Sequence, residues 1–431
     1  MEIVLGKEKR RQAVPSGELG IVVGVDVSKG RIDFAAVRPG EWSKTYTVRQ
    51  DGEGYEHFDR WLGELKERGY EVWVAFEPTG PYSTCLGEWL LEKGYRAVQV
   101  NPYHVKRTKE VRDNSPLKSD GKDTLVIAGL VWQGCYRELL GLQGVYAELR
   151  AATTNWDSLA KERTRLRNEF QALLEVWFPE LGDLFKDKAC KTVRAIVSHY
   201  ESSKQIAAAR LSSLRTVIRK ASLGRVSPGK AEEIRRLARE SISISHGQRE
   251  RQRHMSRLLL RLEEVEEEQR ELKQRLEELL LELPEARHML SVPYVGIITV
   301  AGLLGECGDL RRFPSCEALE KFLGLNLYEV SSGQHKGKHH ISKRGRSQGR
   351  YLACQAATLQ MKRGALYHDF YQERKAKGQS PNSSRVAIAR KLLALLYAIA
   401  RDRQPFDRER FNRARAGDDR PAHQGMQAKA A

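Results

Sequence analysis

Residues 20–27 read GIVVGVDV, a β-branched run that carries one acidic residue, Asp26, near its end. A short and almost continuously apolar run of this kind is typical of a buried strand. Working outward from it, we expect further strands in the next hundred residues. The runs that we assign to strands cover residues 20–27, 31–37, 44–48, 71–76 and 96–100.

Segments with helical periodicity lie among and after these strands. They cover residues 54–68, 84–93 and 119–132. The resulting order β-β-β-α-β-α-β-α is that of an RNase H-like α/β fold. We therefore predict an α/β domain over residues 18–140.

The rest of the chain reads as almost wholly helical. Apolar residues follow 3-4 spacing from 149 to 177 and again from 255 to 283, which predicts coiled-coil pairing, either within one chain or between chains. These stretches frame a helical coiled-coil region at 145–284, with a basic insert at about 180–250 to which we assign no role. We predict a third, helical domain at 285–402 and a disordered tail at 403–431, because the tail is rich in Arg, Asp, Gly and Gln.

The charge balance favours a polyanionic partner. The chain has 74 Lys and Arg against 56 Asp and Glu, a formal net charge of +18, which favours nucleic acid. The six cysteines form no CxxC pair, the first residues hold no apolar signal sequence, and no apolar run is long enough to cross a membrane. We expect a cytoplasmic protein with no membrane partner.

Four carboxylates stand where strands end and a helix begins. Asp26 and Glu77 come at the ends of two predicted strands, and Asp120 and Asp123 are three apart, on one face of a predicted helix. Acidic residues that gather in one place repel one another, and divalent cations remove that repulsion. Hard oxygen ligands suit Mg²⁺, with Mn²⁺ as an alternative. Singly, each acid also fits a turn cap or a solvated helix face.

Two features of the C-terminal region suggest contact with nucleic acid. Residues 293–296, PYVG, lie between two short helical patterns and fit a helix-hairpin-helix turn, or an ordinary helical hairpin. Ser331 and Ser332 open a glycine-rich cationic loop that could lie along a phosphate backbone. Its candidate nucleic-acid-binding residues are Lys336, Lys338, Lys343, Arg344, Arg346 and Arg350.

Three N-terminal pieces resemble a known family. They are VGVDVSKGRIDFAAV, AFEPTGPYSTCLGEWLLEKGYRAVQVNP and LKSDGKDTLVIAGL. They resemble the DEDD transposases and recombinases of insertion-sequence family 110, relatives of Piv-type invertases and of RuvC-like resolvases. The family's metal-binding tetrad falls on Asp26, Glu77, Asp120 and Asp123. Thr124 stands where the family usually has Ala.

The C-terminal segment resembles the transposase domain of the same family. The family pattern runs GLxP, about four residues, then Ser-Gly, and its nucleophilic serine falls on Ser332, with Ser331 the weaker candidate. Leu327 replaces the GLxP proline and keeps the spacing. The two resemblances cover about half of the chain, and the basic insert is longer than the family needs.

The resemblance implies a mechanism and partners. It implies Mg²⁺-assisted attack of Ser332 on double-stranded DNA at element ends and targets, a covalent phosphoserine link, and rejoining without ATP. It also implies guidance by a structured bridge RNA. The expected assembly is a homo-oligomer, a dimer or tetramer held by the coil, in which one subunit's serine meets another's acids.

Two other functions fit the residues. A RuvC-like nuclease or junction resolvase would use water as its nucleophile and leave Ser332 structural. A non-enzymatic nucleic-acid-binding scaffold would not need the acids.

Overall fold

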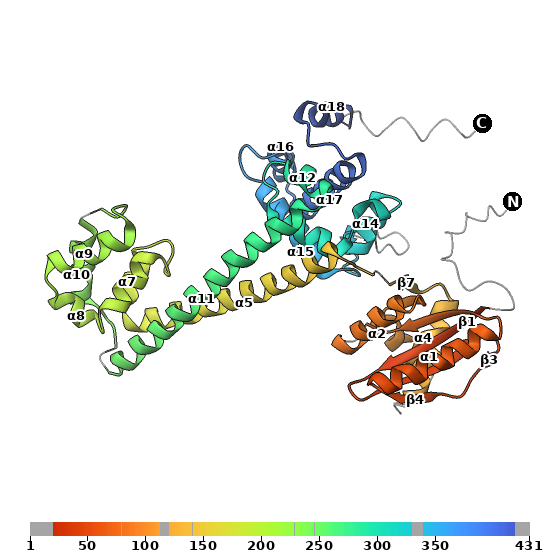
Figure 1. Ribbon diagram of the computed structural model, residues 1–431. Coiled ribbons are helices and arrows are strands. Elements are labelled where there is room, and N and C mark those ends of the chain that lie inside the picture. The colour runs from red at the N-terminus through yellow and green to blue at the C-terminus, as the bar shows by residue number, and fades with distance from the viewer. Residues whose placement is uncertain are drawn as a thin grey trace. The chain divides into compact units, whose positions relative to one another are not determined.

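The computed structural model describes residues 20–78, 80–112, 120–139, 141–227, 229–244, 246–329 and 339–418. The chain divides into two compact units, which we call the sheet unit, Met1–Gly141, and the helical unit, Leu142–Ala431. The sheet unit is mixed α/β and the helical unit is almost wholly α-helical (Figure 1). No helix in the described ranges is long and apolar enough to span a membrane.

A seven-stranded mixed sheet forms the sheet unit. Its strands are β1 (Gly20–Val27), β2 (Arg31–Arg38), β3 (Glu41–Trp42), β4 (Tyr46–Arg49), β5 (Glu71–Phe76), β6 (Arg96–Val100) and β7 (Tyr136–Glu138). The spatial order is β3-β2-β1-β5-β6-β7, and β4 pairs with β2. β1 runs antiparallel to β2 and parallel to β5, and β5 runs parallel to β6. β1 therefore lies at the centre, where parallel and antiparallel pairing meet.

Helices cover both faces of this sheet. They are α1 (Gly52–Glu67), α2 (Gly80–Glu92), α3 (Pro102–Arg112) and α4 (Asp120–Trp132). Because side chains alternate along a strand, β1 contributes Val23 and Val25 to the core shared with α1 and α2. Val22 faces the opposite way, into the core shared with α3 and α4.

The five predicted strands and three predicted helices of this unit are confirmed, with ends that shift by a few residues. The third strand begins later than expected, at Tyr46, after the short β3. We missed α3 and β7. α3 carries little apolar periodicity, and Val105 is its one described side chain in the core.

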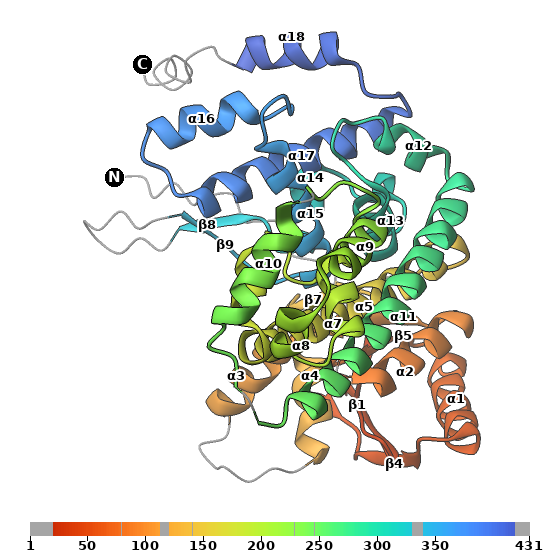
Figure 2. The ribbon, with the colours of Figure 1, turned by 90° about the vertical axis from the view of Figure 1, so that its left-hand side faces the viewer.

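Two long helices form the stem of the helical unit. α5 (Val145–Trp177) and α11 (Gln248–Leu281) lie side by side and antiparallel, as Figure 1 and Figure 2 show. Leu149, near the start of α5, shares a core with Leu276 near the end of α11. At the opposite end, Phe170 shares a core with Met255. The pairing that the sequence left open is therefore within one chain, and the apolar faces expected to hold an oligomer together are buried against each other.

The residues between α5 and α11, which we call the insert (178–247), form a small helical bundle whose core is shared with this end of the stem. Its helices are α6 (Pro179–Asp183), α7 (Lys191–His199), α8 (Ser203–Ala208), α9 (Leu211–Ser222) and α10 (Gly229–Glu240). Val193, Leu214 and Ile234 are fully buried in it. Arg194 of α7 forms a bidentate ion pair with Glu266 of α11, at 2.7 and 2.8 Å, which ties the insert to the stem.

The other end of the stem joins the C-terminal helices in a single core. Their elements are α12 (Pro284–Leu290), α13 (Ile297–Cys307), the 3-10 helix η1 (Leu310–Arg312), α14 (Cys316–Leu323), β8 (Leu327–Glu329), β9 (His339–Ile341), α15 (Ser347–Gln360), α16 (His368–Ala376), α17 (Pro381–Asp402) and α18 (Arg408–Asp418). Leu279 of the stem and Leu396 of α17 lie in the same core, so the core continues across residue 284, where we expected a domain boundary.

The prediction of a disordered tail from 403 was wrong for the residues that the structure describes. α18 follows α17 after a short connection. Phe406 and Phe411 contact each other, with ring centroids 5.7 Å apart, and pack against the core of the helical unit. These two aromatic side chains anchor a segment whose composition alone suggests disorder. Residues 419–431 lie outside the described ranges.

Candidate active site

Asp26 and Glu77 lie at the carboxyl ends of two neighbouring parallel strands. The register pairs Val25 of β1 with Phe76 of β5, so Asp26 and Glu77 occupy the next matched step. Adjacent strands are about 4.8 Å apart, and matched residues on parallel strands point to the same face. Because Val25 and Phe76 face α1 and α2, Asp26 and Glu77 are on the α3–α4 side. Both are partly exposed.

Asp123 is held close to β1 by a tight helix–strand contact. A Cβ on Gly24 would lie 1.9 Å from the backbone oxygen of Thr124 and 3.0 Å from the nitrogen of Ala128. Only glycine lets the backbone of α4 approach β1 this closely. Thr124 is fully buried at the contact. Asp123 directly precedes it, in the first turn of α4.

The pKa shift of Glu77 is consistent with Asp26, Glu77 and Asp123 lying near one another. Burial raises the pKa of Glu77, and the negative charges of Asp26 and Asp123 raise it further, while Lys109 opposes the shift. Lys109, on α3, also forms an ion pair with Asp123. Three of the four predicted acids therefore lie within electrostatic reach of one another, and Lys109 lies among them.

The fourth predicted acid, Asp120, lies in the same region as the other three. Asp120 begins α4, one helical turn before Asp123, and its side chain lies outside the described residues. Among the described side chains, no group of three or more His, Cys, Asp or Glu is close enough to hold a metal ion. Sequence reasoning missed Lys109, because a lysine on a basic helix carries no signal of a nearby carboxylate cluster.

The serine segment connects two short paired strands. β8 and β9 are antiparallel, with Leu327 opposite Ile341 and Glu329 opposite His339. Ser331, Ser332, Lys336 and Lys338 belong to the connection from 330 to 338, which lies outside the described residues.

The base of this hairpin is fixed by a close backbone crossing. A Cβ on Gly345 would lie 2.4 Å from the backbone nitrogen of Gly324 and 2.5 Å from the oxygen of Phe322. The backbone N–H of Ser342 donates to the Asn326 oxygen at 2.9 Å. These contacts tie both ends of the hairpin to the end of α14.

The four described cations of the predicted nucleic-acid loop divide into two pairs. Arg350 donates to the backbone oxygen of Leu323 at 2.9 Å, and Arg346 lies 3.9 Å from a carboxylate oxygen of the buried Glu306. Arg346 and Arg350 therefore hold the hairpin base in place. Lys343 and Arg344 are exposed.

The two short helices predicted on either side of residues 293–296 are present as α12 and α13, an arrangement that both the helix-hairpin-helix and the ordinary helical hairpin share. Tyr294 takes a left-handed backbone conformation, with φ of 63°, and Gly296 caps α13. The Gln360 side chain of α15 donates to the Pro293 oxygen at 2.6 Å and braces the turn.

Two family models match the chain, and both describe transposases. The DEDD transposase model of insertion-sequence family 110 matches residues 23–179, which include all four acids. The transposase model of the IS116/IS110/IS902 family matches residues 286–372, which include the serine segment. The chain belongs to the IS110 family of transposases. Its enzyme class is therefore DNA transposase or recombinase.

Individual relatives agree with the family models. The IS116 element's 44.8 kDa protein from Streptomyces clavuligerus is 24% identical over 388 residues, 90% of this chain and 96% of the relative. The IS110 element's 43.6 kDa protein from Streptomyces coelicolor is 25% identical over 66% of this chain and 71% of the relative. The pilin gene-inverting protein of Moraxella bovis is 31% identical over 29% of this chain and 41% of the relative.

Proposed function

We propose that this IS110-family transposase cuts and rejoins double-stranded DNA with Ser332 as nucleophile and with Asp26, Glu77, Asp120 and Asp123 as its metal-binding carboxylates. The observation that carries the proposal is the convergence of Asp26, Glu77 and Asp123 at the carboxyl ends of β1 and β5. Ligands in open α/β sheets bind at such strand ends. The strand order around β1 supports an RNase H-like fold for this unit.

The four carboxylates are the type of donor that a hard divalent cation prefers, and an ion would have to draw the described ones closer together than they lie in the structure. Carboxylate oxygens suit Mg²⁺, with Mn²⁺ as an alternative. Burial is the main cause of the raised pKa of Glu77, and the smaller contribution from repulsion by Asp26 and Asp123 would be relieved by an ion, which would compete with Lys109 for Asp123. When bound, such an ion supplies Lewis-acid polarisation of the scissile phosphate.

In the proposed reaction, the Ser332 hydroxyl loses its proton and its oxygen forms a bond to phosphorus. The bond to one DNA oxygen breaks, and that oxygen leaves as a free hydroxyl. The phosphoserine link conserves the phosphodiester energy, so a DNA hydroxyl can reverse the step without ATP. The exposed Lys343 and Arg344 would contact the DNA backbone near the hairpin, as would Lys336 and Lys338, with Arg346 and Arg350 supporting them.

We further propose a bridge-RNA guide, a homo-oligomeric assembly with composite sites, and action in the cytoplasm. These follow from the family resemblance and the net charge of +18. Since the apolar faces of α5 and α11 already pair within one chain, an oligomer would need other surfaces of the stem or the C-terminal helices.

A recombination assay in cells that carry the element and its non-coding RNA tests the proposal. Alanine at Asp26, Glu77, Asp120, Asp123 or Ser332 should each abolish rejoined product, whereas Ser331→Ala should retain it. DNA cleavage that needs the acids but survives Ser332→Ala would favour the hydrolytic nuclease. Full recombination by Asp26→Ala would contradict the carboxylate assignment.

A further inference from the structure

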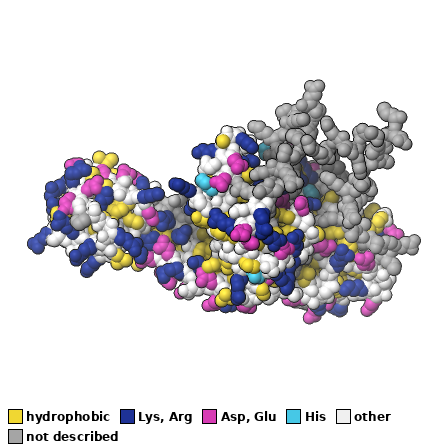
Figure 3. Space-filling view, turned by 90° about the horizontal axis from the view of Figure 1, so that it is seen from above, with side chains coloured by type: hydrophobic (Ala, Val, Ile, Leu, Met, Phe, Trp, Pro, Cys, Tyr) yellow, Lys and Arg dark blue, Asp and Glu magenta, His cyan; other side chains and the backbone are white. Residues whose placement is uncertain are grey.

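Apart from its first two residues, the insert lies outside the segments that the two family models match, which end at 179 and resume at 286. It holds fourteen Lys and Arg against seven Asp and Glu. Its cationic side chains are visible at the left of Figure 3. A folded bundle with this charge excess has the electrostatics of a nucleic-acid-binding module.

Helix α9 carries three of these cations, Arg215, Arg219 and Lys220. Its sequence, LSSLRTVIRKAS, contains no acidic residue. Leu214 and Ile218 are buried in the insert core, which turns the remaining face outward. The exposed side chains of that face are hydroxyls and cations, namely Ser212, Ser213, Arg215, Thr216, Arg219 and Lys220.

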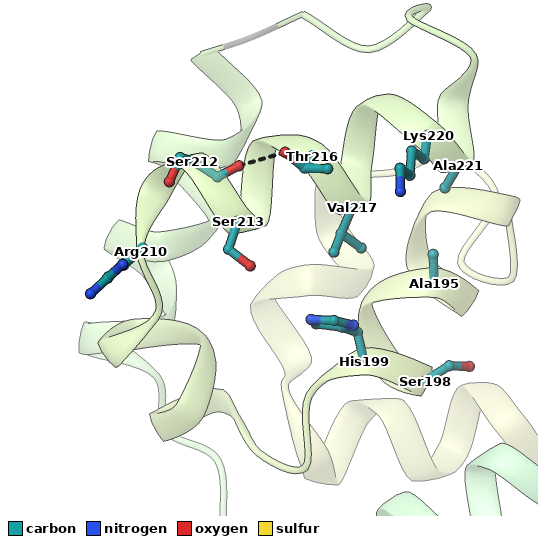
Figure 4. Close-up of a pocket in the computed structure, with 10 residues that line it drawn as sticks. All are labelled: Ala195, Ser198, His199, Arg210, Ser212, Ser213, Thr216, Val217, Lys220 and Ala221. Carbon is teal, nitrogen blue, oxygen red and sulfur yellow. Dashed lines mark hydrogen bonds between the residues drawn. The ribbon is translucent and has the colours of Figure 1, made fainter.

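The surface is hollowed on both sides of α9, so the helix forms a ridge. An open hollow of about 990 Å³ lies at the surface between α9 and α7, which also pack against each other, and is lined by Ser213 and Lys220 of α9 and by His199 of α7. Figure 4 shows His199 and Ser213 pointing into this space from opposite sides. A second hollow of about 400 Å³ lies on the other flank and is lined by Arg215 and Arg219.

Several cations along the ridge have no acidic partner. Of the insert's described side chains, Arg215 pairs with Glu232, whereas Arg210, Arg219 and Lys220 form no ion pair with any described residue. Among the residues that the structure describes, no acidic side chain lines either hollow. Arg210, Arg219 and Lys220 can therefore accept phosphates without losing an ion pair to a described residue, whereas Arg215 would exchange Glu232 for a phosphate.

We propose that α9 is a DNA-binding helix that enters the major groove of duplex DNA, with the two hollows receiving the flanking phosphate strands. The helix is about 18 Å long at 1.5 Å per residue. A protruding helix fits the roughly 12 Å wide major groove of B-form DNA, whereas the deep, narrow major groove of A-form RNA does not admit one. Hydroxyls and cations are the side chains that contact phosphate oxygens. This surface is separate from the proposed catalytic residues, so the inference does not depend on Ser332.

The test is binding of the full-length protein to a short random-sequence DNA duplex, measured by fluorescence anisotropy over a series of salt concentrations. The variant Arg219→Gln/Lys220→Gln removes two ridge cations. The control Lys186→Gln/Lys204→Gln removes two exposed insert cations that line neither hollow. The ridge variant should bind about tenfold more weakly, and the slope of log K against log[salt] should decrease by about two.

A gain-of-charge variant protects the test against misfolding. Ser213→Lys adds a cation to the exposed ridge and should bind DNA several-fold more tightly, with a salt slope steeper by about one. Equal binding by the ridge and control variants, with no gain from Ser213→Lys, would overturn the proposal. A loss confined to an RNA duplex of the same sequence would also overturn it, and would assign the ridge to RNA.

Discussion

Replacing Gly24 by alanine tests whether the contact between β1 and α4 positions the carboxylates. The new Cβ would lie 1.9 Å from the backbone oxygen of Thr124, where ordinary contacts begin at 3.4 Å. A backbone oxygen cannot rotate away as the end of a side chain can. To restore an ordinary contact distance of 3.4 Å from 1.9 Å, α4 must therefore move by about 1.5 Å. Asp123 would move with it, away from Asp26. Overpacking of this kind typically destabilises a protein by about 1–3 kcal/mol.

The catalytic effect should exceed the stability effect. A displacement of about 1 Å at a reacting centre can reduce the rate about 100-fold, so recombination should fall by that order even where the protein remains folded. Gly30→Ala is the matched control, because nothing lies within 4 Å of its added Cβ. Hydrogen exchange of peptides from β1 and β5 would report local stability beside the recombination assay. If Gly24→Ala and Gly30→Ala behave alike in both measurements, the contact does not position the site.

Three further predictions follow from other contacts. Lys93 donates a hydrogen bond to Asp59 at 2.7 Å, and this bond is the main cause of the lowered pKa of Asp59. The ionised Asp59 therefore stabilises the fold above its unfolded pKa of about 3.9, and this stabilisation is lost as the pH falls. Asp59→Asn should therefore destabilise the sheet unit by about 0.5–1 kcal/mol at neutral pH, since the pair is partly exposed, and the difference from wild type in acid titrations should vanish well below pH ~3.9. Arg194→Lys keeps the charge but loses the bidentate geometry toward Glu266, and should loosen the insert by about 1–2 kcal/mol in hydrogen exchange; unchanged protection of α7 would contradict this. Lys109→Ala removes a cation that pairs with Asp123 and should tighten Mg²⁺ binding about three- to tenfold in calorimetry, whereas weaker binding would show that Lys109 supports the metal site.

The sequence predicts best those elements whose local residue pattern directly reflects their position in the fold. β1 and β5 are apolar on both faces because they lie at the centre of a covered sheet, so their continuous β-branched runs are visible without a structure. Asp26 and Glu77 stand out for the same reason, since an acid is unexpected at the end of such a run.

Other features depend on contacts between residues distant in the sequence. Lys109 is one basic residue among several on α3, and only the packing of α3 beside α4 brings it to Asp123. Phe406 is tied to the fold by contact with a core assembled from helices far along the chain. The ridge on α9 is defined by two hollows, and the helical pattern of its sequence does not reveal them.

The most direct test of the central claim is covalent capture of the serine–DNA link. Purified protein, element-end DNA, the adjacent non-coding RNA and Mg²⁺ would be mixed, denatured and separated on a gel, and the adduct would be mapped by mass spectrometry. The account predicts an adduct at Ser332 that disappears in Ser332→Ala and Asp26→Ala and persists in Ser331→Ala. Cleaved DNA with no adduct, still formed by Ser332→Ala, would contradict it.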